Sequence, residues 1–357
     1  MWFNAGVGEM PSLQRAPSRT APDAADAASV DRVAYRPDLD GLRAIAVALV
    51  ILTHAKWPWP NNGGDTGVTA FFVLSGFLIT NLLVNQQERQ GRIHVLAFYR
   101  RRVVRLGPAL LGVLAFTLAL GLATGWGPGR DWQLGIVSSL AYVSNWVEVG
   151  NINIDPLGHT WSLAIEEQFY LFWPAVLILL RGRPLLFAIV AIIAVSLIRI
   201  VATGPFEYFS TAARVDAILV GCVLALIGAR WSRWYAVAGL AALVAVSFLD
   251  LSHDIAIPAA IVATAAIIGG RLEPLGRLAP AGLRAYSLYL WNWPMTILFG
   301  SVALVAPLMT IVVAELSFRL LEAPFLHRGK AARPSVTVVP KDPVASPGQT
   351  DLLTAER

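Results

Sequence analysis

The sequence is poor in charge. Only 14% of its 357 residues are charged, whereas a soluble domain carries roughly 25%. Apolar residues make up 56% of the chain, and the mean hydropathy is +0.60. A chain of this composition has too little polar surface to face water on all sides, so an ordinary soluble protein is excluded.

The sequence also has little that would support disulfides, metals or nucleic acid. Its single cysteine, Cys222, lies in an apolar run, so no intramolecular disulfide can form. We find no internal repeat and no cluster with metal-ligand spacing, and we expect no metal. The net charge of +5 would permit nucleic-acid binding, but the basic residues stand at the ends of apolar segments, as in the cytoplasmic loops of membrane proteins. We therefore expect no nucleic-acid partner.

The two ends of the chain differ from its middle. Residues 1–34 are rich in Ala, Pro, Ser and Asp without a continuous apolar run, which predicts a disordered cytoplasmic arm rather than a cleavable signal peptide. Residues 327–357 contain four prolines and mixed charge and are predicted to form a disordered cytoplasmic tail. Residues 35–326 would then form one transmembrane domain.

Long apolar segments fill this middle region. A helix that crosses a bilayer needs about 20 mainly apolar residues. Eleven segments approach this length: 42–57, 66–85, 106–125, 132–149, 160–180, 184–202, 212–229, 234–249, 254–269, 284–300 and 302–320.

The arginines orient these segments, because short cytoplasmic loops carry the excess of Lys and Arg. Residues 86–105 contain six arginines, so this loop and the amino terminus, two spans earlier, are expected in the cytoplasm. If 132–149 crossed the membrane, many later arginines would fall outside. Ser and Asn side chains also interrupt this segment, and we interpret it as an outer-face or re-entrant element. The prediction is an all-α transmembrane bundle of about ten spans with both termini cytoplasmic.

Ionisable residues inside spans are costly and mark function by default. Arg43 and His54 stand eleven residues apart, which places them on one helix face, within ~20° and roughly 16 Å apart. The alternative is an arginine that snorkels and a histidine at the interface.

A pair of carboxylates, Glu166 and Glu167, opens another predicted span. Arg199, Arg214 and Asp216 are expected in the same outer half of the membrane as this pair and His54. Such a group suits acid/base catalysis. The alternative is structural pairing of Glu166 with Arg214 or Arg199.

Arg102 and Arg105 lie about one helical turn apart at the cytoplasmic end of a span. Planar guanidinium groups suit phosphates. A positive-inside anchor or a patch that binds anionic lipids would explain the two arginines equally well.

Several motifs in order resemble the acyltransferase 3 family. The family's Arg-x10-His motif matches Arg43 and His54 within the stretch that begins Tyr35-Arg36-Pro37-Asp38-Leu39-Asp40-Gly41-Leu42. The other matching stretches are Phe71–Ile79, Arg102-x-x-Arg105, Thr160–Tyr170 (TWSLAIEEQFY), Arg214–Ala217 with Gly221, Tyr286–Trp291 and Glu322–Phe325. Together they cover roughly residues 35–326.

The resemblance implies an enzyme of the bacterial cytoplasmic membrane. Such an enzyme would move an acyl group, often acetyl, from cytoplasmic acyl-CoA to a hydroxyl of a glycan, lipid-linked sugar or similar acceptor. His54, Glu166 and Arg43 would be catalytic, with His54 as the base and Glu166 orienting its imidazole. Arg102 and Arg105 would bind the donor. The expected substrate-binding or structural residues are Asp40, Trp161, Ser162, Glu167, Arg214, Asp216, Tyr289 and Asn292.

One departure from the family pattern stands out. Asn292 replaces a histidine that the family usually has. An amide cannot shuttle a proton at neutral pH, which leaves Asn292 a hydrogen-bonding role. No segment resembles the soluble esterase-like domain of some members, and we expect a chain without it.

Two alternatives stay open. His54 could itself be acylated and relay the group across the membrane. A transporter or flippase of glycans or lipids would instead show polar residues throughout the bundle and often an inverted repeat, neither of which we find.

Overall fold

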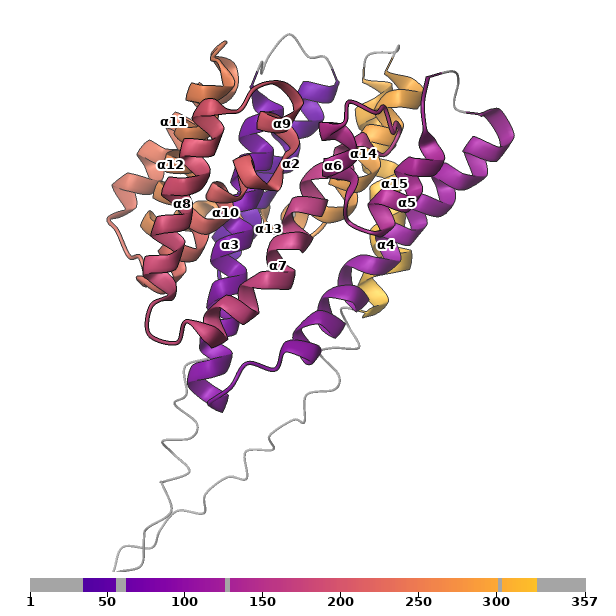
Figure 1. Ribbon diagram of the computed structural model, residues 1–357. Coiled ribbons are helices and arrows are strands. Elements are labelled where there is room, and N and C mark those ends of the chain that lie inside the picture. The colour runs from indigo at the N-terminus through magenta and orange to yellow at the C-terminus, as the bar shows by residue number, and fades with distance from the viewer. Residues whose placement is uncertain (1–34, 56–61, 126–128, 301–303, 326–357) are drawn as a thin grey trace, which may run out of the picture.

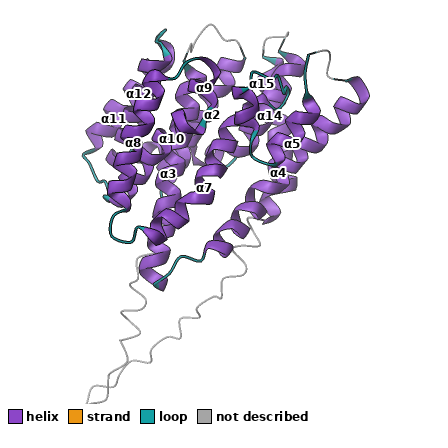
Figure 2. Cartoon of the chain, viewed as in Figure 1, coloured by secondary structure: helices purple, strands orange, loops and turns teal. Residues whose placement is uncertain are grey.

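Every regular element in the described part of the chain is a helix (Figure 2). The computed structural model describes residues 35–55, 62–125, 129–300 and 304–325. The predicted arm at 1–34 and all of the predicted tail at 327–357 lie outside these ranges. The all-α expectation is confirmed for the described residues.

Ten long helices coincide with the ten predicted spans (Figure 1). They are α2 (Pro37–His54), α3 (Gly63–Gln90), α4 (Val95–Thr124), α7 (Trp161–Leu179), α8 (Pro184–Val201), α10 (Thr211–Leu226), α11 (Arg233–Phe248), α12 (His253–Gly270), α14 (Ala285–Phe299) and α15 (Val305–Ser317). The shorter helices are α5 (Trp132–Leu140), α6 (Ser144–Val149), η1 (Gly158–Thr160), α9 (Gly204–Phe209), η2 (Glu273–Leu278), α13 (Ala279–Gly282) and η3 (Phe318–Glu322).

Six helical segments are long and apolar enough to cross a membrane: α3, α4, η1 with α7, α8, α9 with α10, and α12. The remaining four long helices fall short for local reasons. Helix α2 carries Asp38, Asp40 and Arg43 within its 18 residues. Helices α11, α14 and α15 have only 16, 15 and 13 residues. The number of spans therefore stays a prediction.

The segment 132–149 is not one continuous helix. It forms α5, of nine residues, and α6, of six. At about 1.5 Å per residue, neither is long enough to cross a hydrocarbon core of ~30 Å. The Asp131 side chain accepts the backbone N–H of Leu134 at 2.9 Å and caps α5. This break agrees with the interruption that Ser and Asn side chains predict.

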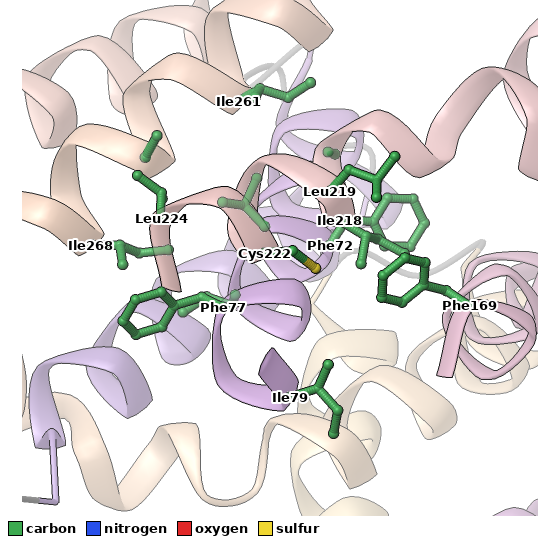
Figure 3. Close-up of a cluster of buried hydrophobic side chains, with 14 of the residues drawn as sticks. Phe72, Phe77, Ile79, Phe169, Ile218, Leu219, Cys222, Leu224, Ile261 and Ile268 are labelled. Atoms are coloured by element: carbon green, nitrogen blue, oxygen red, sulfur yellow. The ribbon is translucent and has the colours of Figure 1, made fainter. Parts of the chain in front are cut away.

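Helices α3 and α10 pack backbone against backbone. A Cβ added at Gly76 would lie 1.8 Å from the Ile218 carbonyl oxygen, and one at Gly221 would lie 2.0 Å from the Val73 carbonyl oxygen. The buried Cys222 lies at this crossing, within the apolar core that surrounds it (Figure 3). Small residues allow such close approach between membrane helices, where van der Waals packing drives association.

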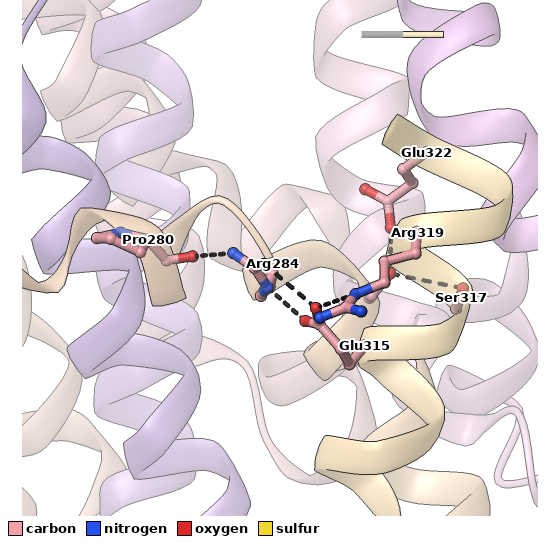
Figure 4. A network of polar contacts seen from close by, with 7 residues as sticks. Pro280, Arg284, Glu315, Ser317, Arg319 and Glu322 are labelled. Carbon is pink, nitrogen blue, oxygen red and sulfur yellow. Dashed lines mark hydrogen bonds and ion pairs between the residues drawn. The ribbon is translucent and has the colours of Figure 1, made fainter. Parts of the chain in front are cut away.

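Charged side chains join α14 to α15 (Figure 4). Arg284, just before α14, forms an ion pair with Glu315 of α15, and Arg319 binds the same carboxylate at 2.6 Å. Ser287 donates a hydrogen bond to the buried Glu322. These groups hold the last two long helices together.

The two ends of the bundle differ. At the upper end in Figure 1, which we call the His54 end, α2 finishes and α6 and α9 lie. At the lower end, α3 finishes and α4 begins with the arginine-rich stretch, and we call this the arginine end.

Candidate active site

A cavity of about 360 Å³ lies at the His54 end. Five separate parts of the chain form its walls: the last turns of α2, the first turns of α3, the segment from α6 to α7, the end of α9, and α14. The chemically important side chains that line it are His54, Glu148, Asp155, His159, Tyr289 and Trp293.

The imidazole of His54 is held in one orientation. Its Nδ1 lies 2.5 Å from Asn292 Oδ1, and its ring lies edge-on to the Trp293 indole with 4.6 Å between centroids. The Trp293 indole is fixed in turn, because its Nε1 donates to Asp155 Oδ1 at 2.6 Å. An amide oxygen only accepts, so Nδ1 carries the proton and Nε2 keeps its lone pair. His54 is thus arranged to accept a proton through Nε2.

Glu166 does not hold His54, in contrast to the role that the sequence suggested. Ser75 Oγ donates to Glu166 Oε1 at 2.9 Å, and the Tyr170 hydroxyl donates to Oε2 at 3.3 Å. Glu166 lies deeper in the bundle, seven residues and so roughly 10 Å along η1 and α7 from His159. Asn292 takes the position next to Nδ1 that was expected for Glu166.

Arg102 and Glu167 are in contact, although the sequence predicted that they lie in different halves of the membrane. Arg102 donates to Glu167 at 2.7 Å, and its guanidinium lies 3.7 Å from the centroid of the Tyr170 ring. The sequence placed Arg102 at the cytoplasmic end and Glu167 in the outer half. Helix contacts deep in the bundle bring them together.

Arg43 and Arg105 belong to the same positively charged group as Arg102. Arg43 forms an ion pair with Asp40 at 2.6 Å, and Tyr35 donates to the other oxygen of Asp40 at 2.7 Å. Arg105 has no hydrogen-bond or ion-pair partner among the described residues, while Arg43 and Arg102 lie close enough to repel it. Asp40 and Glu322 lie close enough to attract Arg105, so three guanidinium groups gather here with only two of them in direct ion pairs.

The arginines near α10 have other partners than Glu166. Arg199 forms a buried ion pair with Asp216. Arg214 is 1% exposed, and its guanidinium lies 5.3 Å from the Tyr208 ring and 5.7 Å from the Trp161 ring. Neither arginine supports the alternative of a structural pair with Glu166, and neither joins the group around His54.

Ser162 and Tyr289 lie together beside the cavity. Their oxygens are 2.5 Å apart, and the Tyr289 hydroxyl donates to the backbone carbonyl of His159 at 2.9 Å. Trp161 lines the cavity wall next to them. These three expected support residues therefore do gather at the His54 end.

Sequence reasoning missed His159, Glu148 and Asp155. His159 directly precedes the TWSL stretch, and the other two lie in or beside a short polar segment. Their positions next to the TWSL stretch and in a short polar segment were the only features of the sequence that could have indicated a role. Burial, and next the charge of Asp155, raise the pKa of Glu148 to about 7. Among the residues that the structure describes, no three His, Cys, Asp or Glu side chains gather as metal ligands would.

Six apolar helical segments long enough to cross a membrane, with an oriented histidine at one end of the bundle and arginines deeper inside, define the class of multi-pass membrane proteins. The family model described as an acyltransferase domain matches residues 36–318. The chain belongs to the acyltransferase 3 family, which confirms the resemblance and the expectation of an acyltransferase.

Curated relatives agree with this assignment. The chain is 34% identical over 352 residues to the O-acetyltransferase OatA of Staphylococcus aureus (strain NCTC 8325 / PS 47), with 83% of this chain and 58% of the relative covered. It is 30% identical to the peptidoglycan O-acetyltransferase OatA of Listeria monocytogenes, with 83% and 56% covered. The chain thus spans less than two thirds of these relatives' lengths. No solved structure matches it. The expected location is confirmed: this is a multi-pass bacterial membrane protein.

Proposed function

We propose that this protein moves an acyl group, most simply acetyl, from acyl-CoA to a hydroxyl of a surface glycan or lipid-linked sugar. The observation that carries the proposal is the fixed orientation of His54, whose Nδ1 faces Asn292 Oδ1 at the wall of a cavity. Both relatives are named as O-acetyltransferases and the Listeria protein as a peptidoglycan O-acetyltransferase, which supports an acetyl group and a peptidoglycan acceptor.

In the proposed reaction, His54 Nε2 takes the proton of the acceptor hydroxyl as its oxygen attacks the thioester carbonyl carbon. The carbonyl electron pair moves to oxygen to give a tetrahedral intermediate. When this intermediate collapses, the C–S bond breaks, the ester forms, and the CoA thiolate leaves with the proton that His54 holds. Histidine suits both steps because it gains and loses a proton near neutral pH.

The donor's phosphates would bind the positively charged group formed by Arg43, Arg102 and Arg105. Arg43 and Arg102 each form one ion pair, and Arg105 has no hydrogen-bond or ion-pair partner among the described residues. A phosphate oxygen would give Arg105 the direct partner that it lacks among these residues. Arg43 and His54 are roughly 16 Å apart along α2, a distance that an extended pantetheine arm would bridge. Glu166 and Glu167 would then serve the donor side of the site, since Glu167 binds Arg102.

The topology that fits this proposed reaction has ten spans, with both termini in the cytoplasm and the His54 end outside. It places the arginine-rich start of α4 in the cytoplasm, where acyl-CoA is available. The domain would extend over 35–326, with 1–34 and 327–357 as cytoplasmic extensions. Labelling of single cysteines placed at 181–183 tests this topology. Reaction of these cysteines with an external reagent would contradict it.

The function is tested by measuring acetate that mild base releases from isolated surface glycan. Cells that produce the wild-type chain should yield more O-acetate than cells without it. His54→Ala should abolish this increase, because loss of a general base costs ~10²–10⁴-fold in rate. His94→Ala, at the start of α4 and outside the cavity, is the matched control. Membrane levels of each variant must be equal. Near-normal acetylation by a well-folded His54→Ala variant would overturn the mechanism.

A further inference from the structure

A second histidine lies in the cavity and has no assigned role. His159 is 7% exposed, and neither of its ring nitrogens has a hydrogen-bond partner among the described residues. The backbones of Leu290 and Pro156 lie near the ring, but neither forms a hydrogen bond of acceptable geometry. The side chain lines the same cavity as His54.

Unpartnered polar atoms are rare inside proteins, because burial removes the hydrogen bonds that water would make. An imidazole with both nitrogens unpaired costs folding free energy that an apolar side chain of similar size would not. Because the unpaired ring of His159 lies at the wall of a cavity beside His54, we infer that a bound ligand forms the hydrogen bond that the ring lacks.

The segment that carries His159 is firmly held. Tyr289 donates to the His159 carbonyl oxygen, and Ser162 lies against the Tyr289 hydroxyl. Thr160 Oγ1 donates to the Leu157 carbonyl at 2.7 Å and lies 2.9 Å from Ser144 Oγ, whose hydroxyl can donate to it. The backbone that carries the imidazole is thus held rigidly at the cavity wall, as the backbone of a preorganised donor must be.

Several neighbouring donors are already engaged. The Tyr289 hydroxyl donates to the backbone carbonyl of His159, not to its ring. The Trp293 indole donates to Asp155, and the Tyr208 hydroxyl donates to Asp65. The His159 ring N–H is free of such contacts. Two imidazoles in one small cavity do not both become cations, because each positive charge opposes the other. With His54 as the proton acceptor, His159 stays neutral and keeps one N–H.

We propose that the ring N–H of His159 donates a hydrogen bond to the carbonyl oxygen of the acyl group undergoing transfer. This assignment rests on the proposed acyltransferase function. As the acceptor oxygen attacks, the carbonyl electron pair moves to this oxygen, and the His159 N–H stabilises the negative charge that develops. The hydrogen bond is released when the carbonyl re-forms and the thiolate leaves. No proton moves to or from His159.

The test compares His159→Met, which fills similar space without an N–H donor, with His159→Gln, whose amide keeps one. The rate is the O-acetate added to surface glycan per unit time and per amount of membrane protein. His159→Met should lower it ~10²–10³-fold, as expected for loss of an oxyanion donor. His159→Gln should recover at least about a tenth of the wild-type rate. The melting temperature of purified full-length His159→Met in detergent should equal or exceed that of wild type, because the substitution removes unpaired polar atoms.

The results separate this role from a structural one. A near-normal rate for His159→Met would overturn the assignment. The proposed function would still stand in that case, provided that His54→Ala abolishes acetylation. Equal loss in both variants, or a lower melting temperature for His159→Met, would also overturn it in favour of proton transfer or packing. If the wild-type chain adds no O-acetate, the proposed function fails, and this assignment fails with it.

Discussion

Substitution of Asn292 by leucine tests whether this amide sets the working form of His54. Asn292 is 1% exposed and its Oδ1 lies 2.5 Å from His54 Nδ1. Leucine fills similar space but accepts no hydrogen bond. The imidazole would then no longer be held with its proton on Nδ1 and its lone pair on Nε2.

The size of the effect follows from the bond that is lost. A neutral hydrogen bond contributes a net ~0.5–1.5 kcal/mol, and about 1.4 kcal/mol corresponds to a tenfold change. The competent fraction of His54, and with it kcat, should fall about 2–10-fold. His54→Ala should cost far more, ~10²–10⁴-fold. The Nδ1–H left without an acceptor should also lower stability by about 1–3 kcal/mol.

The assay is the initial rate of glycan O-acetylation at equal membrane levels, with melting temperature measured on the purified chain. Thr296→Val is the matched control, because Thr296 lies one turn further on α14 and donates only to the Asn292 backbone carbonyl, at 2.9 Å. That control should keep near-normal activity. An unchanged rate in Asn292→Leu would refute the orienting role. A loss as large as that of His54→Ala would show that Asn292 does more than hold a tautomer.

Three further predictions concern the donor site, pH and packing. Arg105→Gln should raise the KM for acyl-CoA more than it lowers kcat in reconstituted protein. Arg102→Gln should do the same and should also lower the melting temperature, because it leaves Glu167 without its partner. If the dependence of the rate on acyl-CoA is unchanged in both variants, the two arginines serve lipid binding or membrane topology instead of donor binding. Glu148 has a raised pKa of about 7 in the folded chain, so the folded state holds an extra proton between about pH 4.5 and 7 and stability falls as pH rises through this window. Glu148→Gln should flatten this fall in melting temperature, and an unchanged slope would contradict the burial argument. Gly221→Ala should destabilise by at least about 1–3 kcal/mol through steric overlap, since its methyl group would meet the Val73 carbonyl; Gly182→Ala, with open space around it, should leave the melting temperature unchanged.

The helices were predictable from the sequence because the features that define them are local. Apolar runs bounded by arginines predicted ten helices that the structure contains, and polar side chains within 132–149 predicted its break into α5 and α6. Helical periodicity alone placed Arg43 and His54 on one face of α2. The family was equally accessible, because its motifs are short stretches of consecutive residues.

The partners of the site residues depend on how distant helices pack. His54 and Asn292 are 238 residues apart in the chain, and Arg102 and Glu167 are 65 apart. Hydropathy gives each residue only an approximate depth in the membrane. It does not give the tilt or rotation of a helix against its neighbours, which decides the side chains that touch. Glu166 therefore seemed to belong with His54, whereas the packing of α3 against α7 gives it Ser75, and Tyr170 lies one turn away on its own helix. The missing partners of His159 become visible only when all the walls of the cavity are in place.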